Sequence, residues 1–281
     1  MKLENYKDPK AFWNEVSPHL KKEEAKNSLA LGLSYTFQAQ PDDCLYQGAL
    51  FDGDQLAGAI VCSQYRTNRN FVISPVIHPP HAETLFEEFQ KSEIAVTGII
   101  GELNTAKVYE ALFKKIGKKA HTHMTQGIYR CEKVVLPNDS DKVTFRPANL
   151  EDVKQIGEWI ESFHQEAVPH DPPVKGAELA EIKIKNSMIY VVEYDGDLVS
   201  MAAWSRDIGT SCSVNLVFTP NHYRKKGYGT IVTGKLTQHL LNNGKRETNL
   251  YTDMSNPTSN KIYQNIGYQF VCDSVHLGIT E

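Results

Sequence analysis

The second half of the chain alternates short β-rich runs with segments whose apolar residues recur every three or four positions. The run VTFRP (143–147) is followed by Asn149, which is placed to cap a helix. The apolar face of that helix consists of Ile156, Trp159, Ile160 and Phe163. A polar loop (164–173) and a short helix around 176–185 follow. Two β-rich runs then flank Asp195-Gly196-Asp197, and this pattern predicts a hairpin because glycine accepts a positive φ.

The pattern continues to the end of the chain in the same manner. A β-rich run, CSVNLVFTP, stops at Pro220, and the segment GTIVTGKLTQHLLNN has helical spacing with Gly244 as its stop. TNLYTD (248–253) predicts a strand, and NPTSNKIYQNIGY (256–268) predicts a short helix that ends at Gly267. The last run, QFVCDSVHLGIT, again has β character. This order predicts a mixed α/β (α+β) unit.

The first half repeats this plan in a weaker form. Asp52-Gly53-Asp54 lies between two β-rich runs, and its counterpart, which begins at Asp195, lies 143 residues later (195 − 52). TAKVYEALFKKIGKK resembles SNKIYQNIGYQ, and both segments carry a glycine near their end. We therefore predict an internal duplication: one domain over 1–135 and a second over 143–281, each a mixed central sheet flanked by helices. The polar segment 134–142 would link them.

One stretch, NHYRKKGYGT (221–230), has no counterpart in the first half. It places a basic triplet and two glycines between a strand and a helix, where unpaired helix N–H groups and exposed backbone favour an anion. An exposed basic turn without a ligand is the alternative. The stretch lacks the GKT or GKS ending of the P-loop and the glycine spacing of a dinucleotide fold. The matching place after Pro80 reads HAETLFEEFQ, which is acidic and has no glycine pair.

The combined segments VFTPNHYRKKGYGT, TNLYTD and NPTSNKIYQNIGY resemble the GCN5-related N-acetyltransferase (GNAT) superfamily. The resemblance covers roughly residues 143–280 and implies that acetyl-CoA is the cosubstrate. Residues 217–219 would then contact the pantetheine arm, the loop would bind the pyrophosphate, and the last helix would approach the sulfur. The implied cofactor-binding residues are Val217, Phe218, Thr219, Arg224, Lys225, Lys226, Gly227, Tyr228, Gly229, Thr230, Asn256 and Asn260. The first half would be a degenerate copy without this site.

The resemblance also implies a reaction, direct transfer of the acetyl group to a primary amine of a small molecule, peptide or protein. Tyr263 would protonate the departing thiolate, although it could equally be a packing residue on an amphipathic helix. Family members often carry a Glu on the strand before the loop, but CSVNLVFTP has no acidic residue. Asp253 is therefore our candidate for the base. The alternatives are a water relay or a residue of the loop region, namely Glu161, His164, Glu166, His170 or Asp171.

Composition narrows the class of protein further. The chain has 281 residues and a net charge of −4, which disfavours a nucleic-acid partner. Its five cysteines show no metal-binding spacing, so we expect free thiols and no metal. No apolar run is long enough to span a membrane, and we expect a cytoplasmic monomer or homodimer. The competing function is a non-catalytic module that binds or senses acyl-CoA, favoured by the missing strand carboxylate.

Overall fold

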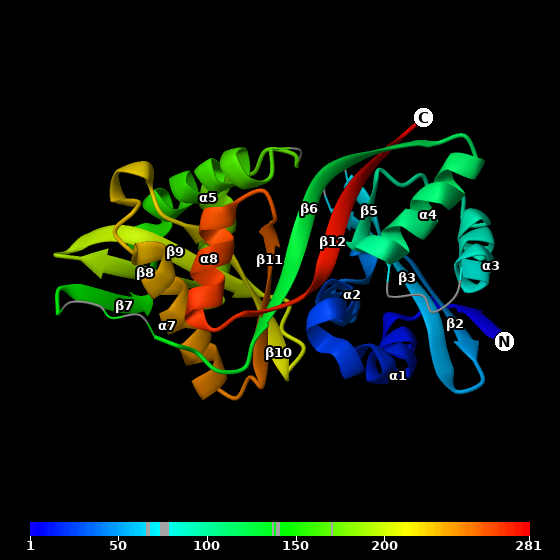
Figure 1. The fold of residues 1–281 in the computed structure, drawn as a ribbon, viewed down its shortest axis with the longest axis horizontal. Coiled ribbons are helices and arrows are strands. Elements are labelled where there is room, and N and C mark those ends of the chain that lie inside the picture. Colours follow the sequence, from blue (N-terminus) through cyan, green and yellow to red (C-terminus); the bar gives the residue numbers. More distant parts are fainter. Residues whose placement is uncertain (66–67, 74–78, 137, 139–140, 170) are drawn as a thin grey trace. The chain divides into compact units, whose positions relative to one another are not determined.

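The computed structural model describes residues 1–65, 68–73, 79–136, 138, 141–169 and 171–281, which form two compact units. The first unit comprises Met1–Ile128 with Val271–Glu281, and the second comprises Tyr129–Phe270. Strands β6 (Lys119–Cys131) and β12 (Gln269–Thr280) contain the positions at which the chain passes between the units. Each unit is a mixed sheet with helices on its faces, which confirms the predicted α/β class (Figure 1).

The first unit begins at the N-terminus and is completed by the end of the chain. Its elements before β6 are β1 (Lys2–Asn5), α1 (Pro9–Leu20), α2 (Glu24–Phe37), β2 (Cys44–Asp52), β3 (Gln55–Tyr65), β4 (Asn68–Ile73), α3 (Pro79–Gln90), β5 (Gly98–Glu102) and α4 (Leu103–Lys115). The strands pair in the order β1-β2-β3-β4-β5-β12, and only the β4–β5 pair is parallel. The Asp52-Gly53-Asp54 turn joins β2 to β3, as predicted.

The second unit follows the predicted order of elements. They are β7 (Val143–Pro147), α5 (Val153–Ala167), α6 (Gly176–Lys185), β8 (Ile189–Tyr194), β9 (Asp197–Ser205), β10 (Ser211–Phe218), α7 (Tyr228–Asn242), β11 (Glu247–Asp253) and α8 (Pro257–Ile266). The strands pair in the order β7-β8-β9-β10-β11, and only β10–β11 is parallel. Single turns of 3₁₀-helix lie at Lys21–Glu23, Pro41–Asp43, Leu150–Asp152 and Asn221–Tyr223.

Helices cover both faces of the second unit's sheet because successive strand residues point to opposite sides. Val191 and Met201 are buried against α5 and α6, whereas their neighbours Val192 and Ala202 are buried against α7. The central strands can therefore be apolar on both faces. In Figure 1 these helices lie about β8, β9 and β10.

Helices α5 and α6 approach each other closely at two glycines. A Cβ atom placed on Gly176 would lie 2.1 Å from the carbonyl oxygen of Gly157, so any side chain there would clash with backbone. The carboxylate of Glu161 accepts a 2.9 Å hydrogen bond from the Gly176 N–H at the start of α6. The two helices are thus fixed over one face of the sheet.

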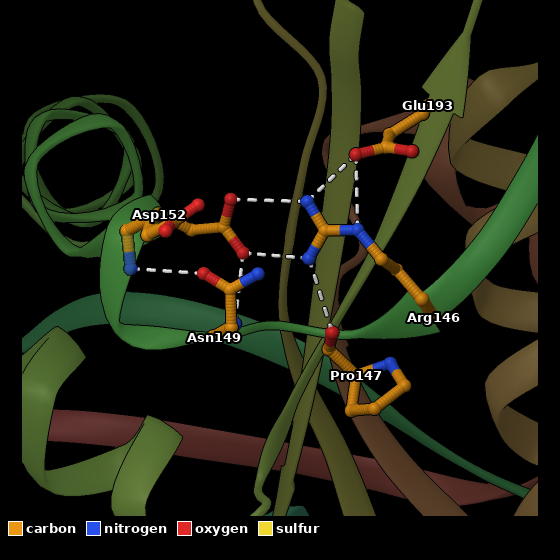
Figure 2. A network of polar contacts seen from close by, with 6 residues as sticks. Arg146, Pro147, Asn149, Asp152 and Glu193 are labelled. Carbon is orange, nitrogen blue, oxygen red and sulfur yellow. Dashed lines mark hydrogen bonds and ion pairs between the residues drawn. The ribbon is translucent and has the colours of Figure 1, made fainter. Parts of the chain in front are cut away.

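An ion-pair network fixes the beginning of α5 (Figure 2). The guanidinium of Arg146 on β7 donates to both carboxylate oxygens of Asp152, at 2.7 and 3.0 Å, and to Glu193 of β8 at 2.6 Å. Asp152 also accepts the N–H of Asn149, whose side chain accepts the N–H of Glu151. Asn149 therefore caps this turn as predicted, and the network joins two strands to the start of the helix.

The compact units differ at their edges from the predicted domain ranges 1–135 and 143–281. Residues 271–281 belong to the first unit, where β12 pairs with β5 from Ser274 to Gly278, so the final strand completes that unit. The functional division of the chain stays a prediction. All five cysteines are free, and Cys62, Cys131 and Cys212 are buried. Among helices in the part of the chain that the structure describes, none is both long and apolar enough to cross a membrane.

Candidate functional site

Strands β10 and β11 separate part-way along their length. Their parallel pairing covers Ser211 to Ser213 and Glu247 to Asn249, although the strands continue to Phe218 and Asp253. A register shift in β10 accompanies this separation, and Leu216 within it has a φ of 48°. Such an irregularity bends a strand away from its neighbour. A gap therefore opens between the carboxyl ends of β10 and β11, directly before the glycine loop.

The glycine loop has a backbone conformation suited to an anion. Lys225 and Gly227 have φ values of 64° and 85°, in the left-handed region, and residues 224–227 are exposed. Left-handed residues within a turn direct successive N–H groups to one side, which forms an anion-binding concavity. Helix α7 begins directly afterwards, and Gly227 has no side chain to cap its first N–H groups. The backbone of residues 225–230 therefore offers donors and the positive end of a helix.

The side chains of the loop are engaged unevenly. Arg224 donates to the carbonyl oxygen of Thr219 at 2.8 Å and forms a 2.6 Å ion pair with Glu166 at the end of α5. Lys226 lies 5.6 Å from the centre of the Tyr223 ring. The predicted contact of Arg224 with phosphate stays a prediction, because its guanidinium is bound to a carboxylate here.

The end of β10 packs closely on the start of α7. A Cβ atom placed on Gly229 would lie 3.3 Å from Oγ1 of Thr219, so a larger residue would crowd this junction. Thr219 is held in turn by Ser200, whose Oγ lies 2.9 Å away and also donates to the carbonyl oxygen of Phe218. Thr219 therefore lies beside the start of α7, and contact of residues 217–219 with a pantetheine arm stays a prediction.

Asp253, Asn256 and Asn260 form the junction between β11 and α8. The Asp253 carboxylate accepts the N–H of Ser255 at 2.8 Å, and the Asn256 side chain accepts the N–H of Ser259 as the helix cap. Asn260 donates to the carbonyl oxygen of Asp253 at 3.2 Å, and its own Oδ1 is buried without a partner in the described structure. The three predicted residues are brought together, and two of them also hold the turn.

Tyr263 is half-buried on α8 and packs against a cluster that includes Leu250, Ile266 and Tyr268. The ring centres of Tyr263 and Tyr268 are 6.0 Å apart. Burial raises the pKa of Tyr263 to about 12, because the charged phenolate is less well solvated there. The side chain is therefore protonated at neutral pH, as a proton donor must be.

Two of the alternative bases, Glu161 and Glu166, have other partners. Glu161 holds the start of α6, and Glu166 is paired with Arg224. His164 lies on α5, which extends to Ala167 and so contains part of the predicted loop. The Asp171 N–H donates to the carbonyl oxygen of Val168. His170 lies outside the described residues.

A polar cluster beside the gap was missed in the sequence. Ser211, Ser213 and Asn215 occupy every second position of β10 and so share one face. Ser213 donates to Asn249 of β11. Of Ser211, Asn215 and Asn249, each has a buried polar atom that lacks a partner in the part of the chain described. The period-two polar residues in an otherwise apolar strand were the available signal.

Comparisons with known proteins agree with this geometry. Residues 153–268 match the model of the acetyltransferase (GNAT) family. No curated protein matches the chain by sequence. Solved structures that cover nearly all of the chain include a Drosophila protein, with a TM-score of 0.72, 10% identity, and coverage of 99% of this chain and 98% of its own. They also include a GCN5-related N-acetyltransferase from Sphaerobacter thermophilus, with a TM-score of 0.66, 12% identity, and coverage of 99% of this chain and 95% of its own. A tandem GNAT protein from the clavulanic acid biosynthesis pathway has a TM-score of 0.60, 9% identity, and coverage of 100% of this chain and 98% of its own.

These structural matches concern the fold, because their sequence identities are low. They extend over both units, whereas the family model matches only part of the second. The predicted fold class is therefore confirmed over the whole chain, and the division into domains stays a prediction.

Proposed function

We propose that the protein, whose residues 153–268 form a domain of the GNAT family, transfers an acetyl group from acetyl-CoA to a primary amine. The observation that carries this proposal is the gap between β10 and β11, which leads to a loop of exposed N–H groups at the start of α7. A long ligand with an anionic end and a neutral arm fits that arrangement. The primary amine as acceptor rests on the family resemblance.

The residues around the gap fit acetyl-CoA as the cosubstrate. The N–H groups of residues 225–230 would hold the pyrophosphate, and the backbone of residues 217–219 would border the pantetheine arm. The amide side chain of Asn260 lies where the arm would reach α8, and its buried Oδ1 has no partner in the described structure. Lys225 and Lys226 are exposed and add positive potential at the loop.

When bound, acetyl-CoA supplies an activated acetyl carbon, whose bond to sulfur breaks as its bond to the acceptor nitrogen forms. Tyr263 would give its proton to the sulfur that leaves, and its phenolate would regain a proton as the acceptor nitrogen loses one on forming the amide. Asp253 would take the proton that an ammonium acceptor loses before attack. Its half-buried carboxylate stands at the end of β11, beside the gap.

Thiol release tests the proposal directly. The protein is mixed with acetyl-CoA and a panel of amines, and free coenzyme A is followed with a thiol reagent alongside mass spectrometry of the amine. We expect amine-dependent thiol release and a mass gain of one acetyl group. Tight calorimetric binding of acetyl-CoA without turnover of any amine would instead establish the competing function, a non-catalytic acyl-CoA-binding module.

A further inference from the structure

An arginine that contacts Tyr251 but keeps one buried N–H group without a partner in the described structure lies beside the polar cluster of the second unit. Arg206 directly follows β9, and its guanidinium lies 5.0 Å from the centre of the Tyr251 ring on β11. Its Nη1 atom is buried and has no hydrogen-bond partner, and its side chain forms no ion pair with any described residue. Arg206 is half-buried, and a cation with a buried N–H group that lacks an acceptor is costly unless a ligand supplies one.

A second cation, Lys183, lies close enough to Arg206 for the two positive charges to repel each other. Lys183 lies on α6, the helix that covers this face of the sheet, and it forms no ion pair within the described residues. Burial, followed by repulsion from the charge of Arg206, lowers the pKa of Lys183. Burial likewise lowers the pKa of Arg206, and the opposing influence comes from Tyr251 rather than from a carboxylate. The two charges thus destabilise each other in the free protein.

The backbone gives an independent reason to regard Arg206 as functional. Its φ is 54°, a left-handed conformation that costs an ordinary residue on the order of 1 kcal/mol and that Gly or Asn adopts more readily. A long charged residue at this position is therefore unfavourable both for the backbone and for solvation. Such strain is often retained where a residue binds a ligand, and this motivates the hypothesis that Arg206 binds one.

The neighbouring strand residues supply further unused polar groups. Asn249 is 1% exposed, and its Nδ2 donor has no partner in the described structure. Asn249 and Tyr251 are two residues apart in β11, so their side chains leave the strand on one face. Asn215 lies on β10, the strand that pairs with β11, and its buried Oδ1 acceptor has no partner in the described structure. The cluster therefore combines cationic donors with an acceptor for an N–H group.

The position of the cluster relates it to the acceptor. The proposed acetyl-CoA residues lie at the carboxyl end of β10, whereas Ser213 and Asn215 lie nearer its beginning. A ligand bound with its anionic end at the glycine loop would occupy the carboxyl end of β10. The second substrate could then bind near the beginning of β10. Resting on the proposed function, we infer that the acceptor is an amine that also carries an anionic group, a carboxylate or a phosphate, which Arg206 and Lys183 bind.

Matched acceptor pairs test this inference. Glycine is compared with glycinamide, and phosphoethanolamine with ethanolamine, so each pair differs in its anionic group. We expect kcat/KM to be at least tenfold higher for the anionic member of one pair, and that pair identifies the anion. Equal or better turnover of the neutral members of both pairs would overturn the inference while leaving the acetyltransferase intact.

Variants locate the anion site. Arg206→Asn removes the charge and suits the left-handed backbone, so we expect a folded protein with at least a tenfold higher acceptor KM and an unchanged acetyl-CoA KM. Lys183→Gln should act in the same direction. Lys185→Gln is the control, because Lys185 lies on the same helix but is exposed and paired with Glu181. Unchanged acceptor KM in both Arg206→Asn and Lys183→Gln would refute the assignment.

A binding measurement separates failure of this inference from failure of the proposed function. The same four amines are titrated calorimetrically into the protein with coenzyme A present, which requires no turnover. If none is acetylated but the anionic members bind in an Arg206-dependent way, the transferase is rejected and the anion site stands. If the wild type binds neither anionic member better than its neutral partner, the anion site is rejected.

Discussion

Each unit contains a parallel strand pair, and a helix follows the first strand of that pair. The two units differ in the residues with which this helix begins. In the first unit β4 and β5 pair from Asn70 to Val72 and from Gly98 to Ile100, and in the second unit β10 and β11 pair over three residues in the same way. The helix that follows begins with Pro79 and Pro80 in the first unit and with Tyr228 and Gly229 in the second. Proline has no N–H, so α3 lacks two of the donors that α7 offers.

The tyrosines of the last helices differ in a similar way. Tyr109 in KVY of α4 corresponds to Tyr263 in KIY of α8. Tyr109 is 0% exposed and its hydroxyl has no partner in the described structure, whereas Tyr263 is half-buried beside the proposed site. The comparison teaches that a duplicated fold can keep its packing residues while losing the donors and access that a ligand needs.

Removal of each tyrosine hydroxyl in turn gives the largest expected difference in kcat between the two units. Tyr263→Phe should lower kcat about a hundredfold or more, because a proton donor is lost, while affinity for acetyl-CoA stays nearly constant. Tyr109→Phe should leave kcat unchanged and preserve or increase stability, because it removes an unpaired buried hydroxyl. Steady-state kinetics and calorimetry measure both variants. Wild-type turnover in Tyr263→Phe would show that it is not an essential acid.

Substitution of a cation near the start of each unit should lower the free energy of unfolding by different amounts. Arg146→Met breaks a partly buried network with Asp152 and Glu193, and we expect a loss of about 3 kcal/mol in the free energy of unfolding. Lys2→Met in the first unit removes only exposed pairs with Glu4 and Glu15, and we expect a much smaller loss of stability.

Urea unfolding followed by tryptophan fluorescence checks this difference. Trp13→Phe as the background confines the signal to Trp159 and Trp204 of the second unit, and the reciprocal background with Trp13 alone reports the first. Equal losses for Arg146→Met and Lys2→Met, each measured in its own unit, would contradict the assigned roles.

A proline at the start of α7 would make it resemble α3. Gly229→Pro removes one N–H, and we expect acetyl-CoA to bind roughly tenfold more weakly. Gly229→Ala is the matched control, since it adds a Cβ near Thr219 but keeps the donor. Calorimetric titration with acetyl-CoA compares them. An equal weakening in both variants would assign the effect to crowding rather than to the lost donor.

Acid sensitivity gives the smallest expected difference. Burial tends to raise the pKa of Asp152, but hydrogen bonds from Arg146 and Asn149 outweigh it and hold the pKa below its usual 3.8. The unfolded state therefore binds this proton first, so the stabilisation is present above the usual pKa and is lost as pH falls through the folded-state pKa. Unfolding measured between about pH 5 and pH 2 should show this loss, and Arg146→Met should weaken it. The same acid dependence in both proteins would exclude Asp152 as its source.

Local patterns predicted most elements of the second unit. The turn at Asp195-Gly196 and the stop at Gly267 lie at positive φ, where short-range sterics favour glycine. The N-terminal strand and helices (residues 2–37) were not anticipated, because their apolar spacing is less regular. The glycine loop could be located from its residues alone, but its pairing of Arg224 with Glu166 could not, since the two are 58 positions apart.

The sequence by itself determined the order of strands and helices in the second unit, the glycine loop, and the prolines that remove donors from α3, because each depends on neighbouring residues and covalent chemistry. Only the tertiary structure decided that β12 pairs with β5, that Tyr109 is buried more deeply than Tyr263, and that Arg206 and Lys183 share one region. These features depend on which surfaces of distant segments meet, and burial and electrostatic interaction are set by that packing rather than by local pattern.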